Sequence, residues 1–444
     1  MTGTVPEPPV ETTHRAVFAV AIPMTLAYLT TPLVGIVNLG VIGQIGDPAL
    51  VGGVAIGALV FDIVFMTFNF LRAGTTGLVA QADGARDRRA VAATLARALV
   101  LALGIGLAIL ILQVPIIAVA QRLIGGSEAV QAATADYWHI RVFSAPVALI
   151  NYVILGWLIG LGHARHGLAL QILLNGVNIA ASVLLVQTAG WGVAGVGWAS
   201  LAAESVTAVA GLALAVRLTP RELWPNRPVL FDGGAFRRLV AINRDIMIRT
   251  FALLFAFALF TARSAAAGDV ILAANEILMN LIVLAAYFLD GLAAAAEQLA
   301  GRAIGARHRP SFERAVRLTV AWGFVVGGIA SLAFFLAGPV LVDAMTTSLD
   351  VRETARHYLP YAALFPLVGT LAYQMDGVFI GATWTDDMRN MMLVSLVVYL
   401  AAWWVLEGAL GVTGLWLALL VFLAVRGLTL VWRTRTRIGP AFDG

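Results

Sequence analysis

Residues 91–113 read VAATLARALVLALGIGLAILILQ, and the only charged side chain in this stretch is Arg97. A run of about 20 mostly apolar residues is long enough to cross a membrane as one α-helix. The pattern extends over the chain, because 60% of the 444 residues are apolar and 12% are charged, whereas soluble domains carry roughly 25% charged residues. The sequence therefore predicts a polytopic membrane protein and excludes a soluble globular fold.

Twelve such stretches predict an all-α membrane protein with twelve transmembrane helices. Cysteine is absent, which excludes disulfides and Cys-ligated metals, and we expect no metal site and no cofactor. The predicted spans are 17–42, 52–80, 91–113, 130–161, 167–188, 195–217, 238–262, 270–299, 314–337, 354–382, 389–406 and 412–432.

The arginines indicate how the chain is oriented. All 29 basic residues are arginine; nineteen lie at the termini and on the connections that share their side, against four on the opposite side. Because basic residues concentrate in cytoplasmic loops, we expect both termini to be cytoplasmic. The proline-rich segment 1–16 is predicted to be a disordered tail that lacks the features of a signal peptide, and 433–444 a second tail. The arginines are scattered over short loops, so no nucleic-acid partner is expected.

The two halves of the chain resemble each other. Four matches recur at an offset between 219 and 221: Ala21-Ile22 with Ala241-Ile242, Gly84-Ala85-Arg86 with Gly305-Ala306-Arg307, Pro146 with Pro366, and GVAG at 192–195 with GVTG at 411–414. We therefore expect two pseudo-symmetric six-helix lobes, related by an axis along the membrane normal. These are an N-lobe at 17–217, a cytoplasmic linker at 218–237 and a C-lobe at 238–432, an architecture typical of alternating-access transporters.

Acidic residues inside the predicted C-lobe spans are the first functional candidates, because a charge in the hydrocarbon core costs about 3 kcal/mol on insertion scales. One helix carries a polar stripe whose spacing keeps it on one face; its members are Glu276, Asn280, Tyr287, Asp290 and Glu297. The alternatives are that Glu276 and Glu297 are interfacial and that Asp290 pairs with an arginine such as Arg249.

A second C-lobe acid, Asp376, follows Tyr373 on one helix face; the alternative is a hydrogen-bonded structural acid. Asp245 and Arg249 are four residues apart and are predicted to pair along their own helix.

The N-lobe stripes are mostly neutral. Asn175, Asn178 and Ser182 share one helix face with Gln171, and Asn38 lies on the first span. Such residues either line a substrate cavity or join helices by hydrogen bonds. Asp62 is the one deep acid of these stripes, with pairing to Arg72 as its structural alternative, and Glu204 is a lone acid of undecided role.

Several blocks, in order and over the whole chain, resemble the multidrug and toxic compound extrusion (MATE) transporters, and within them the DNA-damage-inducible protein F (DinF) branch. The resemblance implies twelve helices in two lobes around a V-shaped cavity, and export of organic, often cationic or amphipathic compounds driven by proton or sodium entry. The blocks include AIPMTLAYLTTPLVGIVNLGVIGQIGDPALVGGVAIG from Ala21, AYFLDGLAAAAEQLAG from Ala286 and MDGVFIGATWTDDMRN from Met375.

The chain departs from this family at two positions. Relatives usually have an aspartate where this chain has Asn38, and often a second one at Ser182, whereas the acids at Asp290 and Asp376 are retained. The resemblance thus makes coupling through the N-lobe doubtful unless Asp62 substitutes.

We therefore expect coupling through Asp290 and Asp376, with Glu297 as a relay. Desolvation favours the protonated form of a carboxyl group in an apolar cavity, so a proton and a cationic substrate can compete for it. Tyr287 and Tyr373 are expected to line the substrate cavity, with Asn280 and the polar N-lobe residues named above.

The resemblance implies a small-molecule substrate, H⁺ or Na⁺ as coupling ion, contact with membrane lipid, and a monomer in the bacterial inner membrane. A flippase for lipid-linked precursors, a membrane-embedded enzyme and a passive channel are the alternatives. The flippase would favour an arginine-lined cavity, whereas most arginines lie in loops; the enzyme is disfavoured because no HExxH-type motif occurs.

Overall fold

The fold was determined as a computed structural model that describes residues 11–443, and these residues form helices without any strand. The predicted disordered tail falls largely on residues 1–10, outside the described residues. Its last three positions are helical, since α1 begins at His14.

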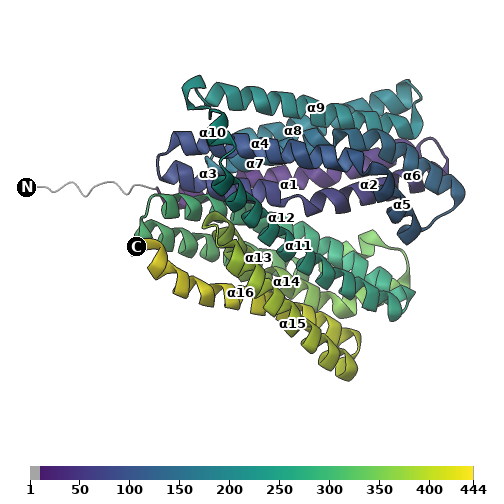
Figure 1. The fold of residues 1–444 in the computed structure, drawn as a ribbon. Helices are drawn as coiled ribbons and strands as arrows, with labels where there is room; N and C mark the ends of the chain where they lie inside the picture. Colours follow the sequence, from purple (N-terminus) through teal and green to yellow (C-terminus); the bar gives the residue numbers. More distant parts are fainter. Residues whose placement is uncertain (1–10, 444) are drawn as a thin grey trace, which may run out of the picture. The chain divides into compact units, whose positions relative to one another are not determined.

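The first half of the chain contains nine α-helices joined by short connections (Figure 1). They are α1 (His14–Gly43), α2 (Pro48–Thr67), α3 (Phe70–Gly84), α4 (Arg88–Ile111), α5 (Gln113–Ile124), α6 (Glu128–Arg141), α7 (Ala145–Gly160), α8 (Ala164–Ser182) and α9 (Gly192–Leu218), with a 3-10 turn η1 (Val142–Ser144) before α7 and a π-helical turn η2 (Val183–Thr188) after α8.

The second half contains longer helices. After the 3-10 turn η3 (Arg221–Leu223) and the single turn α10 (Arg227–Leu230) come α11 (Gly233–Ala266), α12 (Asp269–Gly305), α13 (Arg309–Met345), α14 (Leu349–Gly381), α15 (Thr385–Leu410) and α16 (Val412–Phe442).

Twelve helical segments in the described part of the chain are long and apolar enough to cross a membrane, as predicted. Three of them are interrupted, and one of these is Arg227–Ala266, broken between α10 and α11. The segment made of α2 and α3 is broken around Phe68 and Asn69, and α6 passes to α7 through η1, just before Pro146. Proline lacks the N–H that a continuous helix needs, which accounts for the break before α7.

The helices differ from the predicted spans in two main places. The connection after the third span contains the short apolar helix α5, whose 12 residues are too few to cross a bilayer. The last helix continues ten residues beyond the end of the predicted span, to Phe442. The arginines of that extension ended the hydropathy signal without ending the helix, and two of them, Arg433 and Arg437, are paired with Asp387.

The chain divides into two compact units. Unit 1 comprises the described residues up to Thr25, Ala80–Arg86 and the chain from Ala241; unit 2 comprises Leu26–Val79 and Asp87–Val240. In unit 1, α12 lies beside α14, and α15 beside α16; in unit 2, α2 lies beside α6, and α8 beside α9 (Figure 1). The predicted lobe boundaries stay predictions.

Small residues allow the close approach of α12 and α14 in unit 1. Residues 291–300 of α12 are buried without exception. A Cβ at Gly381 would lie 2.1 Å from the carbonyl oxygen of Glu297, and one at Gly377 would lie 2.4 Å from that of Ala293. Such contacts require glycine, and close packing of small residues is a main source of helix association in membranes.

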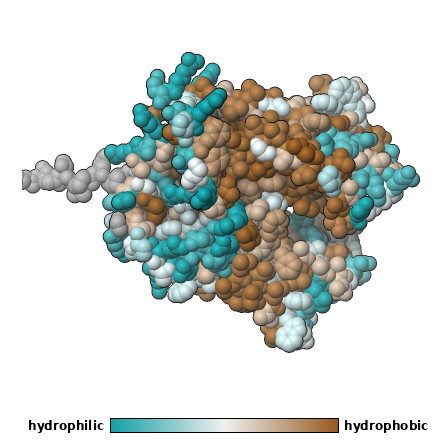
Figure 2. Space-filling view, viewed as in Figure 1, coloured by the Kyte–Doolittle hydropathy of each residue, from teal (hydrophilic) through white to brown (hydrophobic). Residues whose placement is uncertain are grey.

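Large apolar side chains cover the outer faces of the helices. On α13, for example, Ile329 and Leu336 are 63% and 74% exposed. Figure 2 shows apolar side chains gathered along the middle of the helices and hydrophilic ones toward their ends. This distribution suits helices surrounded by lipid tails and headgroups.

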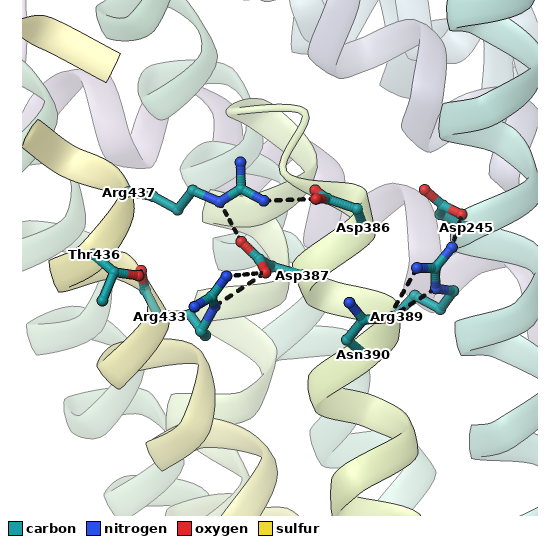
Figure 3. A network of polar contacts seen from close by, with 8 residues as sticks. All are labelled: Asp245, Asp386, Asp387, Arg389, Asn390, Arg433, Thr436 and Arg437. Carbon is teal, nitrogen blue, oxygen red and sulfur yellow. Dashed lines mark hydrogen bonds and ion pairs between the residues drawn. The ribbon is translucent and has the colours of Figure 1, made fainter. Parts of the chain in front are cut away.

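Charged side chains of α11, α15 and α16 in unit 1 form two groups of ion pairs (Figure 3). The buried carboxylate of Asp387, at the start of α15, accepts hydrogen bonds from Arg433 (2.6 Å) and from Arg437 of α16. Arg437 also donates to Asp386 at 2.6 Å. These bonds hold the last turns of α16 against α15.

The second group in Figure 3, around Asp245, corrects the predicted Asp245–Arg249 pair. Asp245 instead accepts from Arg389 of α15 at 2.6 Å and from the adjacent Arg244 at 3.0 Å, while Arg249 bonds to Asp376. The i, i+4 spacing permitted the predicted pair, but it gave no information about partners on other helices.

Replacing Asp387 by asparagine is expected to loosen the end of α16. The variant loses a charge-assisted interaction with two arginines, and hydrogen bonds to charged groups contribute about 1.5–3 kcal/mol. Amide hydrogen exchange of residues 434–442 should therefore accelerate by at least about tenfold. The matched variant Asp386→Asn removes one bond from a 51% exposed carboxylate and should change exchange less; equal effects of the two variants would contradict this assignment.

Candidate functional site

The polar centre of unit 1 is an acid held by two arginines. Asp376 lies on α14 and is 5% exposed, and its Oδ2 accepts hydrogen bonds from Arg249 of α11 and from Arg426 of α16. Its other oxygen, Oδ1, is buried and has no hydrogen-bond partner. Two guanidinium groups stabilise the ionised carboxylate, so protonating Asp376 would weaken two charge-assisted bonds. This arrangement matches the structural alternative for Asp376.

Tyr373 and Asp290 flank this triad. The guanidinium carbon of Arg426 lies 6.0 Å from the centre of the Tyr373 ring. Asp290, which is half-buried on α12, and Arg249 are both close enough to Tyr373 to interact with it electrostatically. The structure thus brings the predicted residues Asp290, Tyr373 and Asp376 into one cluster, which we call the unit 1 cluster.

The other residues of the predicted α12 stripe differ in exposure along the helix. Glu276 and Asn280 are exposed, and the Asn280 side chain donates to the carbonyl oxygen of Glu276 at 2.9 Å. Tyr287 is half-buried, whereas Glu297 is 3% exposed. The stripe therefore passes from an exposed end to the tightly packed contact with α14.

The neutral candidates of unit 2 are hydrogen-bonded to neighbouring helices. Ser182 donates to Asn38 of α1 at 2.7 Å. Asn175 donates to Thr30 of α1 at 2.7 Å, and Asn178 donates to Ser200 of α9 at 3.0 Å. All four predicted residues are at most 7% exposed. These contacts match the alternative that neutral polar residues join helices; their role in a substrate cavity stays a prediction.

Arg141 of α6 is the main residue that sequence reasoning missed. Its guanidinium group lies 3.9 Å from the centre of the Phe61 ring, and it donates to the Tyr137 hydroxyl at 2.7 Å and to Ser200 at 2.8 Å. The sequence did contain a feature that could have identified it, because Arg141 is an arginine inside the predicted span 130–161. Through Ser200, this charge is linked to the neutral network around Ser182.

Two acids lie close to Arg141. Asp62 of α2 is exposed and interacts with Arg141 electrostatically. Glu204 of α9 is half-buried, accepts a hydrogen bond from Asn151 of α7 at 2.6 Å and also interacts with Arg141. Arg141, Asp62 and Glu204, together with Asn151, form what we call the unit 2 cluster.

The structural alternative for Asp62 was a pair with Arg72. The Nε of Arg72 donates to Asn69 at 3.2 Å, and Asp62 has its electrostatic partner in Arg141. Among residues 11–443, no group of three His, Cys, Asp or Glu residues is placed to hold a metal ion.

Comparison with known proteins covers both halves of the chain. The family model described as MatE matches residues 23–184 and 246–405. The chain is 40% identical to DNA damage-inducible protein F of Escherichia coli over 432 residues, which cover 96% of this chain and 94% of the relative. It is 28% identical to a probable multidrug resistance protein NorM of Deinococcus radiodurans, with 99% of both chains covered.

Solved structures share the fold. A crystal structure of MATE in the bent conformation superimposes with a TM-score of 0.87 at 20% identity, covering 97% of this chain and 96% of the other. A transporter of the MOP superfamily from Pyrococcus furiosus, whose structure is described as having a binding pocket of reverse polarity, gives a TM-score of 0.85 at 20% identity.

Proposed function

Because the chain belongs to the MatE family, we propose that it is a secondary active multidrug exporter of small organic molecules, cationic or amphipathic, in exchange for protons or sodium ions. The observation that carries the proposal is the family match in both halves of the chain, together with relatives named as multidrug resistance proteins. The ionisable residues of both clusters support it, because charged groups inside membrane proteins mark ion and substrate pathways.

The two clusters suggest different tasks. In unit 1, the two arginines neutralise the charge of Asp376. The resulting ion pairs join α11, α14 and α16. Asp290 is the unit 1 acid that we assign to ion coupling, with Glu297 as its relay. Tyr287 and Tyr373 would supply aromatic surface for a cationic substrate.

The remaining features of the proposal follow from the family and the sequence. We place the protein in the bacterial inner membrane as a monomer, with both termini cytoplasmic because of the arginine bias, and its partners are lipids and the small-molecule substrate. A flippase for pyrophosphate-linked lipids is not favoured, since Arg249 and Arg426 are engaged by Asp376. Relatives named as transporters support a transport function rather than an enzymatic one.

The proposal predicts that purified protein in liposomes moves ethidium only when an ion gradient is present. A pH gradient and a sodium gradient should be imposed separately, with protein-free liposomes as control. Ethidium flux driven by one gradient and not by the other identifies the coupling ion. Equal flux with no gradient would indicate a passive channel and contradict the proposal.

A further inference from the structure

Unit 2 brings ionisable side chains from four helices together inside the membrane. α2 supplies Asp62, α6 supplies Arg141, α7 supplies Tyr152, and α9 supplies Glu204; all of them interact electrostatically with one another or with Arg141. The fifth neighbour, α8, supplies neutral amides here and carries its ionisable residues Arg165 and His166 at its start. Two further ionisable groups face the cluster: Arg72 of α3, which interacts with Tyr152, and Tyr137 of α6, which interacts with Arg141.

The hydrogen-bond donor to the carboxylate of Glu204 is neutral, whereas the donors to Asp376 are charged. Asp376 is held by two guanidinium groups, whereas the hydrogen bond to Glu204 comes from the neutral amide of Asn151, whose Nδ2 lies 2.6 Å from Oε2 and 3.0 Å from the carbonyl oxygen of Glu204. An amide stays in place whether the carboxyl group is ionised or protonated. Glu204 can thus take up a proton on its other oxygen without losing this bond.

The charges of the cluster favour such an exchange. Arg72 and Arg141 contribute one positive charge each, and Asp62 and Glu204 contribute one negative charge each. The cluster is therefore neutral when Glu204 is ionised and carries one positive charge when Glu204 is protonated. This positive charge repels a cation beside the exposed Asp62, so a proton on Glu204 and a cationic substrate disfavour each other.

The chain also lacks acids at the two N-lobe positions where the resemblance implied them. Asn38 and Ser182 bond to each other, and their network reaches Arg141 through Asn178 and Ser200. This neutral network of unit 2 therefore ends at the charged cluster.

We propose that Glu204 is the proton-binding carboxyl group of unit 2, and that its protonation disfavours binding of the cationic substrate beside Asp62. The inference rests on the proposed function and adds a residue to it. Arg141 keeps the two acids in electrostatic contact, and Asn151 positions the carboxyl group. The proton enters on Glu204 and leaves from it, so the step needs no further reactant.

The test compares wild type with Glu204→Gln, which keeps the size of the side chain and an oxygen that can accept from Asn151. For wild type, ethidium binding in detergent should weaken at least about fivefold as the pH falls from about 8 to 6, a coupling of ordinary size. Glu204→Gln should show a clearly smaller change in affinity between the two pH values, the remainder coming from Asp290 in unit 1. In liposomes it should lose at least about tenfold of the ethidium-evoked proton flux.

Two control variants separate the possible outcomes. Glu313→Gln, which removes an exposed salt bridge with Arg309, should leave binding and flux unchanged. Glu204→Asp retains a titratable group and should keep pH-dependent binding. If Glu204→Gln does not fold, the pH dependence of Glu204→Asp tests the inference instead. Loss of pH dependence in folded Glu204→Asp, or unchanged proton flux in Glu204→Gln, would overturn the inference. A wild type that moves no ethidium under any gradient would contradict the proposed function itself.

Discussion

Replacing Asp376 by leucine is expected to destabilise the protein by about 3–5 kcal/mol, the effect of removing one partner from a buried ion pair. The substitution leaves Arg249 and Arg426 without their shared acceptor, and Arg426 is 2% exposed. Two guanidinium groups would then face each other in a low-dielectric interior. The apparent midpoint of thermal unfolding in detergent, followed by tryptophan fluorescence, should fall sharply.

The matched variant is Arg426→Met, which removes a charge from the same triad. It leaves Asp376 paired with Arg249, so one positive and one negative charge remain, and methionine fills part of the volume of the arginine side chain. We expect a smaller loss than in Asp376→Leu. Equal stability losses in the two variants would show that the triad does not act as one charged group.

Adding a single methyl group at Gly381 is expected to prevent normal assembly of unit 1. In Gly381→Ala, the new Cβ would lie 2.1 Å from the Glu297 carbonyl oxygen and 3.0 Å from the Gly301 nitrogen. Both are backbone atoms, so α12 and α14 must separate, and overpacking of this kind typically costs about 1–3 kcal/mol or more. The yield of monodisperse protein in size-exclusion chromatography should drop severalfold.

Gly328 of α13 provides the control, because a Cβ there meets nothing within 4 Å. Gly328→Ala should be neutral or stabilising, since alanine is favoured over glycine inside a helix by about 0.5–1 kcal/mol. The two substitutions are chemically identical, and only Gly381→Ala should lower the yield. A normal yield and unfolding midpoint for Gly381→Ala would mean that the close approach of α12 and α14 is not required.

The sequence predicted the spans well because length and hydropathy decide whether a helix can cross a bilayer. Prediction from the sequence failed for helices whose length or hydropathy is not that of a membrane span. The extension of α16 to Phe442 is polar, and it depends on Asp387 of another helix. Helix α5 is apolar but too short to count as a span.

Within the candidate site, sequence periodicity identified polar faces but not partners. Asp376 and its two arginines are separated by 127 and 50 positions in the chain, so no local spacing relates them. Arg141 was missed because its acidic neighbours lie on α2 and α9. Residues on a single helix, such as Asp290, could be selected because burial of an acid is itself unusual in a membrane.

The most direct test of ion-coupled export is whether the purified protein concentrates a substrate against its own gradient. Liposomes should be loaded with ethidium at the same concentration inside and outside, and the coupling gradient should then be imposed. The account predicts net ethidium movement opposite to the ion flow, abolished at once by an ionophore that collapses the gradient. Ethidium that never departs from equal concentrations, with correctly folded protein in the membrane, would contradict it.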